Sequence, residues 1–292
     1  MKDNRPYKHF TILEWIVVFS ILFFLVLTSA EAKSKYKKHA VYNIPQRNLS
    51  VMITDVTDGK ILCATNAEEV RALASITKLM TAMITLDDDD DMNRKIMLSK
   101  NAGSHLPVRE YTREELLHAL LVKSDNGAAE TLARNYPGGR TAILNRMNLR
   151  AKTIGMKDTH FDDPSGLSSK NVSTAHDITI MVMAASFYEQ IREISTKKAA
   201  YITTESKRKQ RTVVLNNTNR LILSQIDGVK VSKTGYTNPA GFCVAIMVEK
   251  VINNQKHYQV YVVMGAKNPK QRADEVKRLI YTQYGEPNHE TG

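Results

Sequence analysis

Three short motifs in this chain carry side chains that could act together in nucleophilic chemistry. The first places Ser75 three positions before Lys78 at the start of the apolar stretch SITKLMTAMITL, so both side chains share one face of a helix. A neutral lysine amine can take the proton of a serine hydroxyl and make it a nucleophile. Burial and nearby positive charge lower a lysine pKa in this way. A serine at a helix N-terminus also suits a developing oxyanion.

The S-x-x-K spacing is weak evidence by itself, because it recurs at 34–37, 195–198 and 206–209. Those three matches lie in lysine-rich polar stretches, where chance matches are expected. Only Ser75 opens an amphipathic helix, so we assign the function to this copy of the motif.

The second motif, Ser124-Asp125-Asn126, follows an apolar helical stretch that ends near Val122. Its serine could relay a proton to a leaving group, and its asparagine could bind a substrate carbonyl. The S-x-N spacing also occurs at 99–101 and 169–171. A polar loop at the end of a helix is therefore the alternative interpretation.

The third motif, Lys233-Thr234-Gly235, occurs once and comes at the end of a predicted strand. Average residue usage predicts a given tripeptide in fewer than about one in ten chains of this length. Glycine lets a substrate backbone come close, and the lysine and threonine could grip a carboxylate. The alternative is a strand that simply ends in a turn.

The elements around these motifs follow the order strands, helices, strands, helix. A turn at Thr57-Asp58-Gly59 joins two β-prone runs into a hairpin. A capping box at 112–115 begins the apolar helix before the second motif. We expect strands at 49–55, 60–64, 212–215, 228–232, 241–249 and 258–266, and helices from Ser75 to the acidic run 87–91, from 112 to about 122, and at 140–154, 175–188 and 270–284. This order predicts an α+β fold, in which helices flank an antiparallel sheet and the active site lies between the sheet and a helical lobe at about 80–190.

The N-terminus has the pattern of an export signal. Lys2, Arg5 and Lys8 precede the apolar run 16–29, and small residues at 30–32 have the spacing of a signal-peptidase site. We expect a signal peptide at 1–32 that is cleaved after Ala32; an uncleaved membrane anchor is the alternative. A basic linker at 33–47, the folded domain at 48–286 and a tail at 287–292 would follow.

The composition is that of an ordinary globular protein, with a net charge of +11. Basic clusters at 33–38, 197–198 and 207–211 are either solvated faces or sites of peripheral contact with anionic wall polymer or lipid headgroups. No nucleic-acid motif accompanies them, so we expect no nucleic-acid partner. The histidines lack zinc-site spacing and there is no phosphate-binding glycine loop, so we expect no metal and no cofactor.

The three motifs in this order are typical of class A β-lactamases and penicillin-binding proteins. From about residue 45 to 285, the chain resembles the low-molecular-mass penicillin-binding proteins, which are serine D-alanyl-D-alanine peptidases. The stretches GSHLPVREYTREELLHALLVKSDNGAAETLARNYPGG and GMKDTHFDDPSGLSSKNVSTAHDIT look most like the short endopeptidase branch. The resemblance implies a periplasmic enzyme, membrane-associated if the signal is uncleaved, with peptidoglycan peptide as substrate and β-lactams as inhibitors.

The resemblance also implies a role for each matching position. Ser75 would be the acylated nucleophile, Lys78 its base and Ser124 a proton relay. Substrate binding would fall on Asn126, Lys233, Thr234 and Gly235, and the oxyanion hole on the backbone N–H groups of Ser75 and Tyr236. The substrate peptide would lie beside the K-T-G strand as an added strand.

Three alternatives to a DD-endopeptidase remain. A D-alanyl-D-alanine carboxypeptidase uses the same chemistry, but that branch usually has a further β-rich domain and an amphipathic C-terminal helix, and the tail YGEPNHETG is not amphipathic. A class A β-lactamase needs a glutamate to activate the deacylating water; residues 131–188 contain none, and Asp162 and Asp163 are the nearest substitutes. A non-catalytic wall-binding module is disfavoured by the complete motif set.

The family topology also bears on Cys63 and Cys243, the two cysteines of the chain. It would place their strands about three apart, and at ~4.8 Å per strand this exceeds the reach of a disulfide. The resemblance therefore implies two free thiols.

Overall fold

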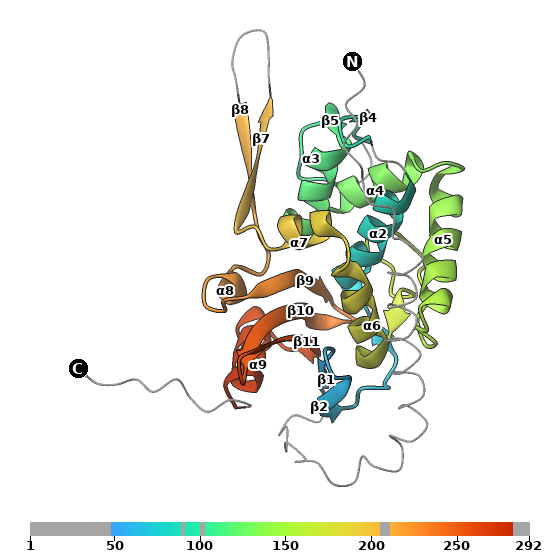
Figure 1. The fold of residues 1–292 in the computed structure, drawn as a ribbon. Coiled ribbons are helices and arrows are strands. Elements are labelled where there is room, and N and C mark those ends of the chain that lie inside the picture. The colour runs from blue at the N-terminus through green and yellow to red at the C-terminus, as the bar shows by residue number, and fades with distance from the viewer. Residues whose placement is uncertain (1–47, 89–90, 100–102, 205–210, 283–292) are drawn as a thin grey trace, which may run out of the picture.

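The computed structural model describes residues 48–88, 91–99, 103–204 and 211–282. A five-stranded antiparallel sheet forms its centre (Figure 1). From one edge to the other, its strands are β2 (Lys60–Thr65), β1 (Ser50–Asp55), β11 (Gln255–Ala266), β10 (Gly241–Ile252) and β9 (Val229–Thr237). The first two strands of the chain thus pair with its last strand, so the sheet joins both ends of the described domain.

Alternation along the strands buries both faces of this sheet, since successive side chains point to opposite sides. On β1, Met52 packs with the helical lobe, whereas its neighbours Val51 and Ile53 pack toward the C-terminal helix α9 (Pro269–Thr282). On β10, Ala245 faces the lobe and Val244 faces α9 in the same way. The sheet is therefore the middle layer between α9 and the lobe (Figure 1).

The helical lobe fills the chain between β2 and β9. Its helices are η1 (Ala74–Thr77, a 3-10 turn), α2 (Lys78–Asp88), α3 (Arg113–His118), η2 (Ala119–Lys123, a π-helical turn), α4 (Asn126–Arg134), α5 (Gly139–Thr153), α6 (Ala175–Ala185) and α7 (Glu189–Ser195). Small two-stranded sheets join β3 (Arg71–Ala72) to β6 (Val172–Ser173), β4 (Lys95–Met97) to β5 (Glu110–Thr112), and β7 (Ala199–Thr204) to β8 (Arg211–Asn216). A short helix, α8 (Arg220–Leu223), precedes β9.

This architecture confirms the predicted α+β class and its antiparallel sheet. The β1–β2 hairpin is present, and Thr112 and Glu115 form the predicted capping box at the start of α3. The two thiols are free and buried: Cys63 lies on edge strand β2 and Cys243 lies three strands away on β10.

Several parts of the structure differ from the prediction or were not predicted, among them α4 and the short strands β3 to β6. The helix expected over 175–188 ends at Ala185, where the Ser186 hydroxyl donates to the Met183 carbonyl, and α7 begins separately at Glu189. Strand β7 was not predicted; its pairing with β8 forms the hairpin that projects from the body in Figure 1.

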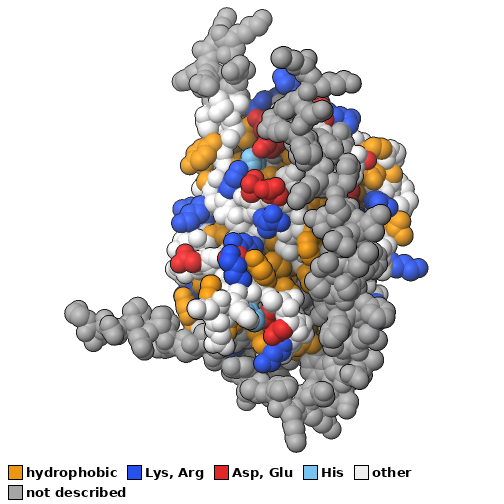
Figure 2. Space-filling view, in the orientation of Figure 1, with side chains coloured by type: hydrophobic (Ala, Val, Ile, Leu, Met, Phe, Trp, Pro, Cys, Tyr) orange, Lys and Arg blue, Asp and Glu red, His pale blue; other side chains and the backbone are white. Residues whose placement is uncertain are grey.

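The predictions for the signal peptide, the linker, residues 283–286 of the domain and the tail fall outside the described residues. The same is true of basic positions 33–38 and 207–209. Within the described ranges, every helix is too short or too polar to cross a membrane. On the face shown in Figure 2, Lys and Arg side chains are scattered among acidic and polar groups. Peripheral contact with wall or membrane through basic patches therefore stays a prediction.

Candidate active site

Strand β9 carries the K-T-G motif along the edge of the sheet that faces the lobe turn η1. The sequence predicted the motif at the end of a strand, and this is wrong: β9 continues to Thr237, which pairs with Gly241 across the β9–β10 turn. Lys233 and Thr234 are consequently held by regular backbone pairing with β10, at positions opposite Ala245 and Val244.

Gly235 brings this strand close to the serine. A Cβ at this position would stand 3.0 Å from the Leu73 carbonyl oxygen and 3.1 Å from the Ser75 backbone nitrogen. These distances are tighter than ordinary van der Waals contact, so any side chain would push β9 and η1 apart. The glycine is therefore needed for the close approach of the two segments.

Ser75 lies in the 3-10 turn η1, one turn before the α-helix that the sequence placed there. The turn begins with Ala74 at a φ of +48°, a left-handed conformation that is costly for a residue with a side chain. The Thr77 hydroxyl donates to the Ala74 carbonyl at 2.8 Å and ties the turn together. Ser75 is half-buried, whereas Lys78 at the start of α2 is fully buried.

The Lys78 amine lies at the centre of the site. Its Nζ donates to Ser75 Oγ at 2.8 Å, to Asn126 Oδ1 at 2.8 Å and to the Ser165 carbonyl oxygen at 2.6 Å. Burial lowers its pKa to about 7, although the carboxylates of Asp163 and Asp125 oppose this shift. A substantial fraction of the amines is thus neutral near pH 7 and able to accept a proton from the serine.

The second motif enters the site from the end of the π-helical turn η2. Ser124 has a φ of +62°, and its Oγ accepts a hydrogen bond from Lys233 Nζ at 2.8 Å. Asp125 caps α4 by accepting from the Ala128 backbone N–H at 2.8 Å, which fixes Asn126 as the first residue of that helix.

The second amine of the site also has a lowered pKa. Lys233 is fully buried, and burial, Lys78 and Arg272 together hold its pKa well below the ordinary value. Its Nζ donates to Ser124 Oγ and, at 2.9 Å, to the Thr234 carbonyl. The nearby Thr234 hydroxyl is hydrogen-bonded to that of Thr218 at 2.6 Å.

Tyr236 stands at the outer end of the motif strand. Its side chain is 51% exposed, its ring stacks on Phe242 at 4.1 Å, and its hydroxyl donates to Asn238 Oδ1 at 2.8 Å. The side chain makes no hydrogen bond with the other predicted site residues in the described part of the chain. The oxyanion role that the sequence predicted for Tyr236 concerns its backbone N–H, which does not depend on these side-chain contacts.

The structure thus brings five of the predicted side chains into two hydrogen-bonded groups that meet at the η1–β9 contact: Ser75, Lys78 and Asn126 form one, and Ser124 and Lys233 the other. Thr234 joins the second group through its backbone carbonyl, whereas its hydroxyl bonds Thr218. A serine hydroxyl bound to an amine of lowered pKa, beside a second hydroxyl bound to a second amine, can transfer protons to and from a reacting group. The sequence analysis missed the Ser165 carbonyl and the Thr218 hydroxyl. A backbone carbonyl leaves no sign in the residue types, and Thr218 belongs to no recognisable motif.

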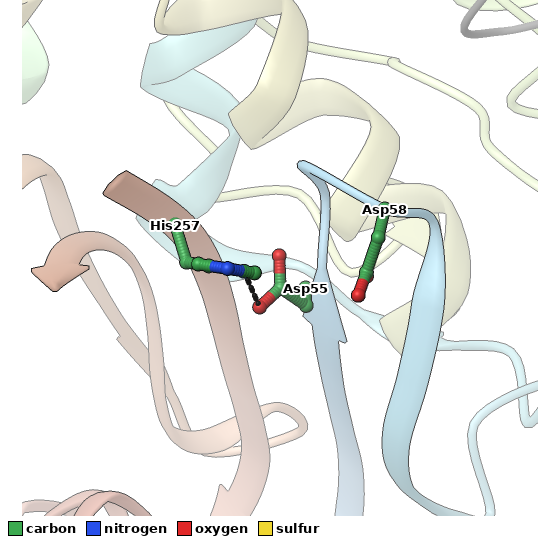
Figure 3. Close-up of side chains that lie close together, drawn as sticks. All are labelled: Asp55, Asp58 and His257. Carbon is green, nitrogen blue, oxygen red and sulfur yellow. Dashed lines mark hydrogen bonds and ion pairs between the residues drawn. The ribbon is translucent and has the colours of Figure 1, made fainter. Parts of the chain in front are cut away.

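A separate group of possible ligands lies at the far end of β1 (Figure 3). Asp55, Asp58 and His257 place their ligand atoms within 4.8 Å of one another. The buried Asp55 carboxylate already accepts hydrogen bonds from His257 Nδ1 at 2.8 Å, Gln259 Nε2 at 3.2 Å and the Thr57 N–H at 3.1 Å. We interpret these contacts as structural hydrogen bonds that join β1 to β11. They are separate from the hydrogen-bonded groups around Ser75.

Comparison with known proteins matches this chain to one family. The family model described as D-alanyl-D-alanine carboxypeptidase, peptidase family S11, matches residues 38–268. The chain is 37% identical over 214 residues to the D-alanyl-D-alanine endopeptidase of Escherichia coli K12, covering 70% of this chain and 68% of that one. It is 30% identical over 285 residues to a D-alanyl-D-alanine carboxypeptidase of Bacillus subtilis, which covers 92% of this chain and 70% of that one.

Solved structures agree with the match. Penicillin-binding protein D2 of Listeria monocytogenes, solved with ampicillin bound, has a TM-score of 0.71 and 26% identity, covering 85% of this chain and all of that one. The Streptomyces K15 DD-transpeptidase has a TM-score of 0.73 and 24% identity, covering 84% of this chain and 97% of that one. This similarity shows that the two proteins share a fold. The chain therefore belongs to the S11 family of serine peptidases, the D-alanyl-D-alanine carboxypeptidase family.

Proposed function

We propose that this chain is a DD-endopeptidase that cleaves D-alanyl cross-links in peptidoglycan through an acyl-enzyme on Ser75. The observation that carries this proposal is the 2.8 Å contact between Ser75 Oγ and the fully buried Lys78 amine, whose pKa is lowered to about 7. An amine that is partly neutral at working pH and already bound to the hydroxyl is poised to act as its base.

The acylation step follows from these contacts. Lys78 takes the hydroxyl proton as Ser75 Oγ attacks the carbonyl carbon of the D-alanyl residue. The backbone N–H groups of Ser75 and Tyr236 would stabilise the oxyanion. When the peptide bond breaks, the leaving amine needs a proton, and Ser124 can deliver one while Lys233, bound to its oxygen at 2.8 Å, replenishes it. The two amines then regain their starting states by exchanging one proton with solvent. In the second step Lys78 takes a proton from water as the water attacks the ester carbonyl, the acyl–Oγ bond breaks, Ser75 Oγ recovers the proton and the acid product leaves.

Substrate binding would use the free edge of the sheet. Strand β9 is the last strand in the order, so a substrate peptide can pair with it as an added strand. Lys233 and Thr234 offer an amine and a hydroxyl for a carboxylate, and Asn126 can bind a substrate carbonyl. Gly235 lets the bound peptide come close to the strand.

The preference for cross-links rests on the relatives. Proteins named D-alanyl-D-alanine endopeptidase in Escherichia coli and Pseudomonas aeruginosa are both 37% identical to this chain. Relatives named carboxypeptidase are 24–30% identical. Carboxypeptidase activity is the second candidate, because the family description carries that name and the chemistry differs only in the leaving group.

Defined muropeptides separate the two activities. We expect the protein to convert a purified cross-linked dimer to monomers faster than it removes the terminal D-alanine from a pentapeptide monomer, with products measured by liquid chromatography and mass spectrometry. The Ser75→Ala variant should do neither. Faster trimming of the pentapeptide would make the enzyme a carboxypeptidase, and activity that survives in Ser75→Ala would refute the proposed nucleophile.

The third candidate, a β-lactamase, is disfavoured by the region that would have to supply a deacylating base. Of the two carboxylates there, Asp163 is engaged by four hydrogen bonds from its own turn, and Asp162 accepts one from the Ser168 hydroxyl at 2.7 Å. The Asp163 carboxylate is thus occupied by its own turn, and Asp162 is oriented toward Ser168. A penicilloyl adduct on Ser75 would accordingly be lost slowly.

The proposed substrate implies a location outside the cytoplasmic membrane, in agreement with the export pattern at 1–32. We expect the mature protein to begin at Lys33 in the periplasm. Intact mass of protein recovered from the periplasmic fraction tests this. A mass that retains residues 1–32 would indicate an uncleaved, membrane-associated form instead.

A further inference from the structure

The turn at 162–168 lies against the first part of the active-site helix α2. Two of its successive backbone carbonyls accept hydrogen bonds from that helix: the Ser165 oxygen from Lys78 Nζ and the Pro164 oxygen from Thr81 Oγ1, both at 2.6 Å. The turn therefore supplies one of the three acceptors that orient the Lys78 amine, and its position along α2 is fixed by a second contact.

The fit between this turn and the serine turn leaves no spare space. Gly166 has a φ of +85°, and a Cβ there would stand 1.9 Å from the Ala74 carbonyl oxygen and 2.9 Å from the Ser75 nitrogen. A small shift of the turn would therefore move either Ser75 or the Ser165 carbonyl. Whatever holds the turn in shape also holds the proton-transfer pair.

A single carboxylate holds the turn in shape. Asp163 is 8% exposed, and its Oδ1 accepts from the Ser165 N–H at 2.6 Å, the Ser165 hydroxyl at 2.7 Å and the Gly166 N–H at 2.7 Å. Its Oδ2 accepts from the Ser168 N–H at 2.5 Å. Burial raises the pKa of this carboxyl, but the hydrogen bonds from Ser168, Ser165 and Gly166 outweigh burial and lower it, so the group is an anion at neutral pH.

Asn171 joins this anionic turn to the helix from the other side. The side chain is fully buried; its Nδ2 donates to Thr77 Oγ1 at 3.0 Å and to the Asp163 carbonyl at 2.8 Å. Its Oδ1 accepts from the Asp162 and Asp163 N–H groups at 2.8 and 3.0 Å. Every hydrogen-bonding position of the amide is thus used to fix the start of the turn against η1.

We propose that Asp163 is a positioning residue for the peptidase reaction: its carboxylate holds the turn whose Ser165 carbonyl fixes the Lys78 amine against Ser75 Oγ. This inference rests on the proposed roles of Ser75 and Lys78. Among the described residues, Asp163 makes no hydrogen bond to the Ser75 hydroxyl or to the Lys78 amine. It therefore acts through the turn and through its charge.

The charge gives the role a signature that packing alone would not produce. The charged groups around the Lys78 amine are Asp163 from the turn, Asp125 from the start of α4 and Lys233 from β9. Burial lowers the Lys78 pKa and Asp163 raises it, so Asp163→Asn should lower it further. The amine would then lose its proton at lower pH, and the acidic limb of the acylation rate would move to lower pH.

The test measures the second-order rate of acylation by a fluorescent penicillin from pH 5 to pH 9, using the full-length protein. We expect Asp163→Asn to acylate about tenfold or more slowly at pH 8, because misplacing reacting groups slightly is costly, and to show an acidic limb at lower pH. Asp163→Glu keeps the charge and should keep the limb near its original pH without restoring the full rate. A purely structural defect would lower the rate at every pH and leave the limb of Asp163→Asn in place.

Asp162→Asn is the matched control. Its carboxylate accepts from the Ser168 hydroxyl at 2.7 Å, and it is not among the carboxylates that raise the Lys78 pKa. It should match the wild-type rate and limb. If Asp163→Asn does not fold, Ser165→Ala removes one of the four donors, keeps the backbone carbonyl and should slow acylation about threefold.

The outcomes separate two failures. A wild-type protein that is not labelled on Ser75 would refute the proposed function itself. A wild type labelled on Ser75, with Asp163→Asn equal to it in rate and limb, would overturn only the positioning role. For the fallback variant, a Ser165→Ala rate equal to wild type would overturn it likewise.

Discussion

Strand β9 and the helical lobe each contribute a fully buried lysine to the active site, but they position it by different means. Lys233 sits in a strand with regular backbone pairing to β10. Lys78 is positioned by irregular backbone: a 3-10 turn entered at a φ of +48° and the 162–168 turn with Gly166 at +85°. The strand side of the site is part of the sheet, whereas the lobe side depends on strained turns fixed by buried polar groups.

This difference indicates where the reactive chemistry is held. Backbone strain costs free energy and persists only where the surroundings impose it, and such strain gathers at functional sites. Ser75, Lys78 and Ser124 all lie on or beside strained lobe segments, whereas Thr234 and Gly235 lie on the regular strand. We therefore expect the activation of Ser75 to depend on the lobe and substrate binding to depend on the strand.

Removal of the two lysine amines, one at a time, should give the largest effects and should separate the two sides of the site most clearly. Lys78→Ala removes the base and should slow acylation by a penicillin about 10²- to 10⁴-fold. Lys233→Ala removes the amine that would bind the substrate carboxylate and return a proton to Ser124, and it should cost about 10- to 100-fold, mainly in apparent affinity. Stopped-flow labelling over a range of drug concentrations separates rate from affinity. Equal losses of rate in both variants would contradict the division of roles.

A glycine-to-alanine substitution on each side of the site compares how well the lobe turn and strand β9 tolerate an added methyl group. Gly166→Ala combines a positive φ with a Cβ placed 1.9 Å from the Ala74 carbonyl and should destabilise folding by about 3 kcal/mol or more. Gly235→Ala meets its nearest atoms at 3.0–3.1 Å with no positive φ, and should cost about 1 kcal/mol. Urea unfolding of both variants measures this. A larger loss at Gly235 would reverse the comparison.

The pH dependence of the wild type reports on the lobe lysine. With a Lys78 pKa of about 7, the neutral amine needed as base is lost as the pH falls, so acylation should be about tenfold slower at pH 6 than at pH 8. A rate that stays constant over this range would mean that the amine is not the titrating base. Circular dichroism at both pH values checks that the fold is unchanged.

The smallest effect should come from the exposed end of the strand. Tyr236→Phe removes a hydroxyl that donates to Asn238 and leaves the backbone N–H in place. The acylation rate should stay within about twofold of wild type, since the proposed oxyanion contact is made by the backbone. Tyr236→Pro removes that N–H and should slow acylation strongly; an unchanged rate in the proline variant would exclude the contact.

The sequence predicted the parts of the fold that local patterns encode. β-Prone runs separated by turn residues predicted the strands of the central sheet, and Thr112 and Glu115 marked the start of α3. It missed β7, which is stabilised by pairing with β8, and the break after Ala185, where Ser186 ends the helix. These features depend on contacts that a window of sequence does not contain.

The sequence also predicted the side chains of the site but not the backbone that positions them. The motif side chains were recognisable from residue type and order, and the structure brings Ser75, Lys78, Ser124 and Lys233 into two hydrogen-bonded pairs. The extension of β9 past K-T-G, the left-handed Ala74 and the Ser165 carbonyl were not predicted. Backbone conformation and backbone acceptors carry the positioning, and they have no residue-type signature.

The most direct test of the account is to incubate the protein with a labelled penicillin and map the adduct by mass spectrometry, with Ser75→Ala alongside. The account predicts a lasting adduct on Ser75 that is absent from the variant. An adduct on another residue, no adduct, or one that disappears within seconds while free drug is hydrolysed would contradict it.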